Sequence, residues 1–151
     1  MGTAGAATPT ERITLSTRFG EFDADSRNLL SFPAGLPGFE QCHRFVLLAS
    51  VEAAPLQVLM SVDGPPASFL AIEPRIVLPT YRCVLSASDR QRLDAAEADT
   101  ILWLSLLTVK DDGAAFANLR APVVVNPARM TGYQVVPQDS LYPLRHPITL
   151  D

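Results

Sequence analysis

The residues that could perform metal or redox chemistry are few and scattered. The chain has two histidines, His43 and His146, and two cysteines, Cys42 and Cys83. Their positions match none of the spacings with which proteins hold zinc, and the cysteines lie 41 positions apart rather than in a Cys-x-x-Cys pair. We therefore expect no metal and no bound cofactor.

Hydrolytic and phosphate-binding chemistry is not indicated either. No serine lies in a Gly-x-Ser-x-Gly turn of the kind that presents a hydrolase nucleophile. The acid pairs Asp23/Asp25 and Asp111/Asp112 stand among polar residues, where nothing apolar would raise a carboxyl pKa for acid–base work. Gly35 and Gly38 flank prolines instead of opening a helix, so they do not form a phosphate loop. The sequence predicts that the protein is not an enzyme.

Composition limits the class of protein. The chain has 151 residues and a mass of 16.3 kDa, about one ordinary domain. With 48% hydrophobic and 19% charged residues it can build a packed core. The formal net charge is −4 and no run of lysine and arginine occurs, so direct nucleic-acid binding is not expected.

The ends and the cysteines suggest a compartment. Residues 1–11 are small and polar and lack the apolar block of a secretory signal, so we expect a disordered tail there and a folded domain over 12–151. The longest apolar stretch, 101–109, is too short to span a membrane. We therefore expect a cytoplasmic protein with no membrane contact, in which Cys42 and Cys83 are free and buried, although a disulfide between them is possible on paper.

Most of the chain is predicted to form short strands. Thirteen prolines interrupt it, which makes long helices improbable. Between them lie short apolar runs rich in β-branched and aromatic residues, each bounded by turn-forming residues. These predicted strands are 13–17, 29–32, 45–48, 56–62, 69–72, 81–85, 100–109, 115–119, 123–125 and 133–136.

Two local signals mark how the strands are connected. Lys110-Asp111-Asp112-Gly113 is typical of a hairpin turn, because glycine accepts the positive φ that such turns need. Ser88 and Gln91 could form a capping box, which predicts a helix over about 88–96. Many short strands with one or two short helices favour a mainly β fold, a small antiparallel β-barrel-like single domain that is closed or half-closed.

Three segments have unusual composition. The first, 32–40, reads Phe-Pro-Ala-Gly-Leu-Pro-Gly-Phe-Glu, a sharply turned loop with apolar residues that could fix it to a core. The second, 118–126, reads Asn-Leu-Arg-Ala-Pro-Val-Val-Val-Asn, and its Pro122 should lie at a sheet edge, a strand start or a bulge. The third, 142–147, reads Tyr-Pro-Leu-Arg-His-Pro and should be extended.

These segments together resemble the bacterial flagellar assembly factor FliW family. The similarity is colinear and covers about Arg12 to Ile148, nearly the whole chain. Besides the three segments, it includes Phe19-Gly20-Glu21, Phe45-Val46-Leu47-Leu48, Ser61-Val62, the strip from Pro74 to Tyr81, and Gln134-Val135. The sequence departs from the family pattern where Ile76, Val77 and Leu78 stand in a strip that is commonly more aromatic.

The resemblance implies a non-enzymatic regulator. FliW-like proteins are small β-barrel-like monomers that bind flagellin in the cytoplasm. When flagellin is exported, the freed protein binds the translational repressor CsrA away from its RNA surface and relieves repression allosterically. The net charge of −4 suits a basic partner such as CsrA, because opposite charge speeds encounter.

Partner-binding residues are expected in three places. The first choice is the strip 74–81, because three consecutive apolar residues cannot all face one side of a strand, so at least one should be exposed. The second choices are the loop 33–40 and the C-terminal segment, where Arg145 could pair with a carboxylate. The predicted residues are Pro74, Ile76, Val77, Leu78, Pro79, Tyr81, Pro33, Leu36, Pro37, Phe39, Glu40, Asn126, Arg145 and His146.

Two other functions remain open from the sequence. One is a flagellin chaperone with no role toward CsrA. The other, from a different class, is a split-barrel enzyme that binds a flavin, which is supported only by fold class and size. Bound flavin would make the purified protein yellow. Binding assays with flagellin and CsrA would distinguish a chaperone that binds flagellin alone from a protein that binds both partners.

Overall fold

The structure is a computed structural model that describes residues 12–17, 20–25, 28–49 and 52–149. The predicted disordered tail, 1–11, lies outside these residues. The described part of the chain contains the following elements in order: β1 Arg12–Thr17, β2 Gly20–Asp25, β3 Leu29–Ser31, β4 Arg44–Ala49, β5 Gln57–Ser61, β6 Ser68–Ile72, α1 Pro74–Val77, α2 Ala87–Arg92, β7 Leu102–Val109, β8 Ala115–Ala117, β9 Val123–Asn126, β10 Thr131–Gln134 and β11 His146–Ile148.

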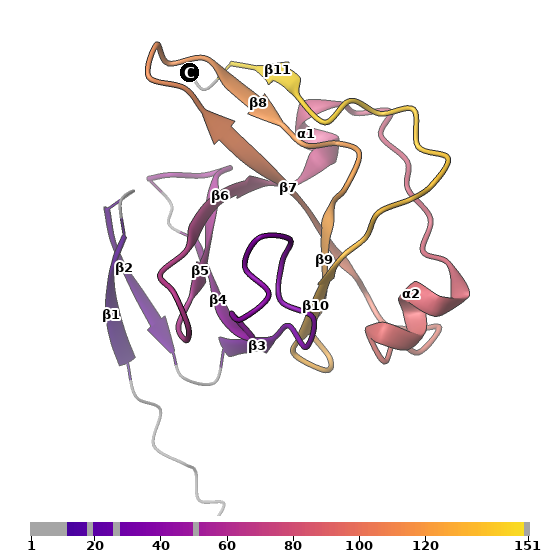
Figure 1. The fold of residues 1–151 in the computed structure, drawn as a ribbon, viewed down its shortest axis with the longest axis horizontal. Helices are drawn as coiled ribbons and strands as arrows, with labels where there is room; N and C mark the ends of the chain where they lie inside the picture. Colours follow the sequence, from indigo (N-terminus) through magenta and orange to yellow (C-terminus); the bar gives the residue numbers. More distant parts are fainter. Residues whose placement is uncertain (1–11, 18–19, 26–27, 50–51, 150–151) are drawn as a thin grey trace, which may run out of the picture.

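Seven strands close into a barrel. The order is β7-β6-β5-β4-β3-β10-β9, and β9 pairs back onto β7 (Figure 1). The pairings are antiparallel except for β3 with β10, which run parallel at Ser31 and Thr131. The predicted mainly β barrel is therefore confirmed, with one parallel contact, between β3 and β10.

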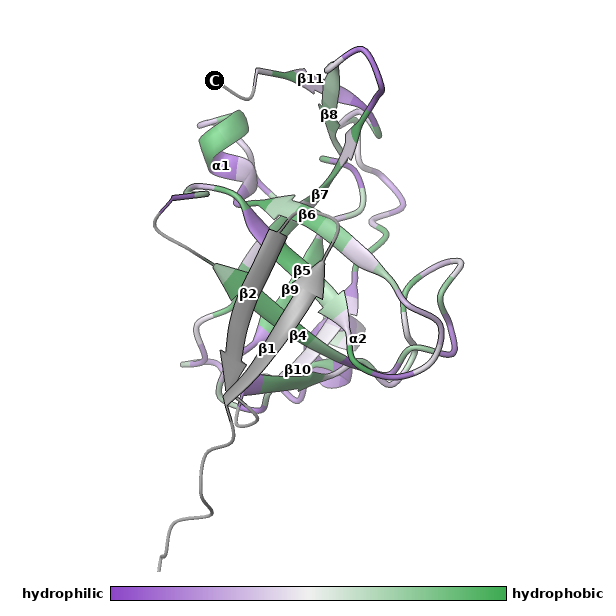
Figure 2. Ribbon diagram, turned by 90° about the vertical axis from the view of Figure 1, so that its left-hand side faces the viewer, coloured by the Kyte–Doolittle hydropathy of each residue, from purple (hydrophilic) through white to green (hydrophobic). Residues whose placement is uncertain are grey.

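The long strand β7 belongs to two structures. Its first half pairs with β9 and β6 inside the barrel, and its last three residues pair with β8. Strand β11 then adds to the outer side of β8. The resulting three-stranded extension rises from the barrel beside α1 (Figures 1 and 2), and the predicted turn at 110–113 forms its hairpin, with Gly113 at φ 87°.

The barrel interior is filled by side chains. Its core contains Phe32, Phe45, Leu59, Leu104 and Val123, each at most 2% exposed. Figure 2 shows the apolar residues concentrated on the barrel strands, whereas the turn at the tip of the extension is hydrophilic. Three further clusters are separate from this core: one on β4 and β5 around Val46, Leu48 and Val58, one beneath α1 and the extension, and one beneath α2.

Both helices differ from what the sequence predicted for their segments. The exposure of the strip 74–81 was predicted from strand geometry, but Pro74 occupies the first turn of α1, where its fixed φ suits a helix. The helix ends at once because Leu78 precedes Pro79 and is extended, with φ −137° and ψ 96°. Helix α2 begins earlier than predicted, because its N-cap is Ser86 and not Ser88.

The α2 cap is a complete capping box formed by residues two positions before the predicted pair. Ser86 Oγ accepts the N–H of Asp89, and the Asp89 carboxylate accepts the N–H of Ser86, each at 3.1 Å. The predicted strand at 81–85 is absent: within the described chain this segment is extended but pairs with no strand.

Candidate protein-binding groove

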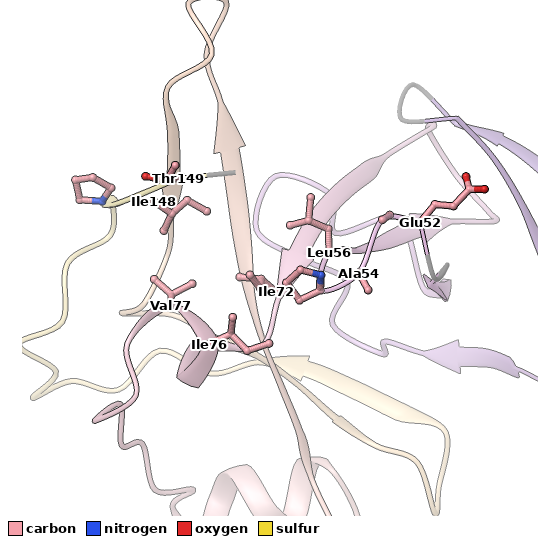
Figure 3. A pocket seen from close by; sticks show the side chains of 11 residues that line it. Glu52, Ala54, Leu56, Ile72, Ile76, Val77, Ile148 and Thr149 are labelled. Atoms are coloured by element: carbon pink, nitrogen blue, oxygen red, sulfur yellow. The ribbon is translucent and has the colours of Figure 1, made fainter. Parts of the chain in front are cut away.

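A groove of about 680 Å³ lies between the barrel and the extension. Its walls are the loop 52–56, helix α1 and strand β11, and Figure 3 shows their side chains facing one another. The lining residues are Glu52, Ala53, Ala54, Pro55, Leu56, Ile72, Ile76, Val77, Pro147, Ile148 and Thr149. Most of them are aliphatic or proline, so the groove is suited to apolar side chains.

Helix α1 supplies an exposed large hydrophobic residue to the groove. Ile76 is 54% exposed, whereas Val77 and Leu78 are half-buried and pack against the cluster around Tyr81 and Leu119. At least one of the three residues was expected to be exposed, and Ile76 confirms this. The reason is the helical turn, which directs successive side chains about 100° apart.

The support beneath α1 is built around Tyr81. Its hydroxyl donates a hydrogen bond to the Leu119 carbonyl at 2.9 Å, and its ring lies 4.5 Å from that of Tyr142. Burial is the main cause that raises the pKa of Tyr81, with smaller contributions from Cys83 and Tyr142. Tyr81 is 4% exposed. It was predicted to contact a partner, but the structure makes it a support for the groove, and Pro74 is buried as well.

The backbone around the groove offers few free donors. Pro147 and Pro55 have no N–H, and the N–H of Leu56 is used by the Ala53 carbonyl at 2.9 Å. In α1 the N–H of Ile76 donates to Glu73 O at 3.0 Å. A partner strand could therefore not form a regular ladder with these walls, and recognition there depends on side chains.

One ionisable side chain lines the groove. Glu52 is exposed, with its carboxylate directed away from the other labelled side chains (Figure 3), and no lysine, arginine or histidine is among the lining residues. An acid beside an apolar surface favours a partner segment that carries a cation next to its apolar side chains.

The loop 33–40 is fixed to the barrel core by two apolar side chains, while five of its eight residues are exposed. Leu36 is 2% exposed and lies in the core, and Phe39 packs edge-on against Phe69 with ring centroids 5.2 Å apart. Pro33, Pro37 and Glu40 are exposed. The Glu40 carboxylate accepts the N–H of Gly38 at 3.1 Å, which is the main cause that lowers its pKa.

Asn126 was predicted as a partner contact, and the structure corrects this. Its side chain is 0% exposed. The amide donates to the Leu93 carbonyl at 3.0 Å and to the Asp99 carboxylate at 3.1 Å, and its oxygen accepts the N–H of Ala128 at 3.2 Å. Asn126 therefore holds the loop after α2 against β9, and its side chain is not accessible to a partner.

The C-terminal candidates lie on the extension. His146 is half-buried in β11 opposite Ala117, and Arg145 is exposed with its guanidinium 4.6 Å from the centre of the Phe116 ring. Ile76 and Val77 thus lie across the groove from the strand that begins at His146. The exposed Pro79 follows α1, while the loop 33–40 and Asn126 lie in other parts of the barrel.

Sequence reasoning did not identify half of the groove. The loop 52–56 and Ile148 carry no motif, because alanine, proline and leucine are common in any loop. The loop and Ile148 line the groove only because the fold places β11 beside α1, about 70 residues away in sequence. The turn Glu52-Ala-Ala-Pro55 could have been noted as a break between two strong strands, but nothing in it indicated binding.

The described residues contain no constellation for metal or redox chemistry. No three His, Cys, Asp or Glu side chains among them are placed to hold a metal ion. Both cysteines are free, as predicted: Cys42 is buried and donates to the Pro65 carbonyl at 3.3 Å, whereas Cys83 is only half-buried. Among these residues, no helix is long and apolar enough to cross a membrane.

Comparison with known proteins gives one consistent result. The family described as FliW protein matches residues 13–148. A flagellar assembly factor FliW from Natranaerobius thermophilus is 34% identical over 138 residues, which cover 90% of this chain and 91% of the relative. The corresponding protein of Carboxydothermus hydrogenoformans is 35% identical over 136 residues, covering 89% and 88%.

A solved structure has the same fold. The crystal structure of a flagellar assembly factor FliW superimposes with a TM-score of 0.78 at 30% sequence identity. The match covers 91% of this chain and 96% of that one. Both chains therefore share one architecture over almost their full lengths.

Proposed function

The chain belongs to the FliW family, and from this premise we propose that it is a cytoplasmic flagellar assembly factor that acts by binding proteins and not by catalysis. The observation that carries the proposal is the family match over 13–148, supported by relatives that are named as assembly factors and not as enzymes.

The proposed mechanism is an exchange of partners. The protein binds flagellin while flagellin is held in the cytoplasm. After export of flagellin, the freed protein binds CsrA and relieves its repression of translation, so that synthesis of flagellin follows its secretion. This sequence of events is what the resemblance to the family implies for a monomeric binding protein.

The groove beside α1 is the proposed partner-binding surface. Ile76 is exposed on the wall formed by α1. The apolar surface around it is extended by Val77, Leu56, Ile148 and Ile72 (Figure 3). Covering one exposed aliphatic side chain of this size stabilises a complex by roughly 1.5–3 kcal/mol. Residues in the centre of such a concave patch are those that usually dominate binding energy.

The test is to measure binding of purified flagellin and purified CsrA from the same organism by size-exclusion chromatography and calorimetry. Ile76→Asp should weaken binding of the groove's partner by tenfold or more, because it places a charge on the apolar wall formed by α1. Val62→Asp is the matched control, since Val62 is 39% exposed but lies outside the groove.

The outcomes separate the alternatives. Binding of both proteins, with flagellin displacing CsrA, supports the full proposal. Binding of flagellin alone supports a chaperone without a translational role. Binding of neither protein would overturn the proposal, and equal losses in Ile76→Asp and Val62→Asp would overturn the placement of the site at the groove.

A further inference from the structure

A second surface lies beside the groove, where two extended segments run alongside each other. The segment 81–85 leads from α1 toward α2, and the segment 135–145 leads from β10 toward β11 (Figure 1). Tyr81 contacts Tyr142, and Leu85 packs in the same cluster as Val135, so the two segments run in opposite directions. Their inward side chains fill the clusters outside the barrel.

The outward side chains include aliphatic residues with little cover. Val84 is 86% exposed, Leu141 is 96% exposed and Leu144 is 52% exposed. Single exposed aliphatic residues are ordinary, but these three lie on two segments that contact each other through Tyr81 and Tyr142.

Three arginines lie on or beside these two segments, and two of them are hydrogen-bonded to Tyr142. The Arg82 N–H donates to the Tyr142 hydroxyl at 2.8 Å, and Arg120 Nε donates to the Tyr142 carbonyl at 2.7 Å. Arg145 follows three residues later and rests on Phe116. Among the described residues, none of the three has a carboxylate within ion-pairing distance, although the chain as a whole is acidic.

The local charge is therefore opposite to that of the whole protein. The two segments contain Arg82 and Arg145 and one acidic residue, Asp139. Arg120, bonded to Tyr142, brings the arginines to three, and Asp89 near Cys83 is the second acid. We name the surface formed by Arg82, Val84, Arg120, Leu141, Leu144 and Arg145 the arm face.

We propose that the arm face docks an acidic amphipathic segment of a partner protein. The carboxylates of that segment pair with the arginines, whose guanidinium groups match carboxylates with two parallel hydrogen bonds. Its aliphatic side chains cover Val84, Leu141 and Leu144. A nucleic acid would satisfy the arginines but leave these three side chains against a polar backbone, so a peptide fits the surface better.

The arm face adjoins the proposed groove, since Arg145 lies two residues before the lining Pro147, but it carries the opposite charge. The groove has Glu52 as its charged lining residue and prefers cations, whereas the arm face prefers anions. The two surfaces therefore suit segments of opposite charge, and the protein could hold two different partner segments at once.

The probes are two synthetic amphipathic peptides that differ only in their charged residues, one with leucine and glutamate and the other with leucine and lysine. They are titrated into the ¹⁵N-labelled full chain, and amide chemical shifts are followed. The acidic peptide should shift resonances of residues 82–84, 120 and 141–145, and the basic peptide should leave them unchanged. Raising the salt concentration should weaken the effect.

Variants test the two components of the surface separately. Arg82→Glu and Leu141→Ser should each weaken binding of the acidic peptide by about fivefold or more, since one removes a cation and the other an aliphatic contact. Arg44→Glu is the matched control, because Arg44 is exposed on β4 and carries the same charge outside the arm face. Unchanged melting temperatures would show that all three variants fold.

Several results would overturn the proposal. The first is equal shifts with both peptides, and the second is an effect of Arg44→Glu as large as that of Arg82→Glu. The third is tighter binding of a single-stranded RNA of similar length, which would make the arginines a phosphate site. The fourth is self-association of the chain that Leu141→Ser abolishes, which would make a second copy the occupant.

Discussion

The ring of Phe32, the residue after β3, lies directly on the backbone of Gly132 in the neighbouring strand β10. A β-carbon built at position 132 would come within 2.8 Å of Phe32 Cε2 and closer still to its neighbouring ring atoms. Phe32 is fully buried and also packs against Phe45, with ring centroids 4.8 Å apart. The Phe32 ring thus packs against Phe45 and fills the space that a side chain at position 132 would need.

Gly132→Ala should therefore lower the free energy of unfolding by about 1–3 kcal/mol, because an added methyl group must displace a fixed ring. Urea denaturation of the purified variant measures this. The cause is steric, since Gly132 does not have the positive φ that makes other glycines irreplaceable.

Gly38→Ala is a useful control for that experiment. Gly38 has φ 85° and nothing within 4 Å of an added β-carbon, so alanine there meets backbone strain without a clash. Phe32→Leu should make Gly132→Ala less harmful than it is in the natural chain, because a smaller side chain leaves room. Strictly additive effects of the two substitutions would contradict the proposed contact.

Asn126→Ala should destabilise the fold by about 1–3 kcal/mol, because the buried carbonyl of Leu93 loses its donor. Asn126→Asp should be more harmful at neutral pH, since two carboxylates would then face each other at Asp99. Thermal unfolding measures both effects. Among folded molecules, the affinity for partners should not change, and a loss of affinity without a loss of stability would restore Asn126 as a contact residue.

Asp99 should make stability depend on pH in the acid range. Its pKa is lowered mainly by the hydrogen bond from the N–H of Ala96, and further by the amide of Asn126. The stabilising effect of the carboxylate is therefore complete above the ordinary aspartate pKa of about 4 and is lost as the pH falls through the lower value in the folded state. The difference in unfolding free energy between the natural chain and Asp99→Asn should shrink from pH 7 to pH 3.

Asp139→Asn is the control, because it removes the same charge from an exposed segment. Its effect on stability should vary less between pH 7 and pH 3 than that of Asp99→Asn. A constant difference between the natural chain and Asp99→Asn over that range would show that ionisation of Asp99 contributes nothing to folding.

The elements that could be predicted from the sequence are those with strong local causes. The alternating apolar residues of 56–62 became β5, and Pro122 lies immediately before β9, at a strand start as expected. The turn at Lys110–Gly113 closes with a hydrogen bond from Gly113 N–H to Lys110 O at 2.9 Å. In these cases side-chain periodicity or backbone freedom decides the structure within a few residues.

The missed elements have causes that lie elsewhere in the chain. Strand β11 is three residues long and contains a proline, and it forms because β8 offers an edge. The segment 81–85 has strand-like composition, but its inward side chains pack into the outer clusters instead of joining a ladder. The groove could be predicted only at Ile76 and its neighbours, because its other walls come from segments that meet through the fold alone.

The start of α2 offers a direct comparison of two serines. Ser86→Ala should lower the free energy of unfolding by about 0.5–2 kcal/mol, because Ser86 Oγ satisfies the free N–H of Asp89 at the first turn. Ser88→Ala should have a smaller effect or even stabilise slightly, since Ser88 lies inside the helix, where alanine is the better helix former. Chemical denaturation of both variants measures the difference, and a larger loss for Ser88→Ala would place the cap where the sequence alone had suggested it.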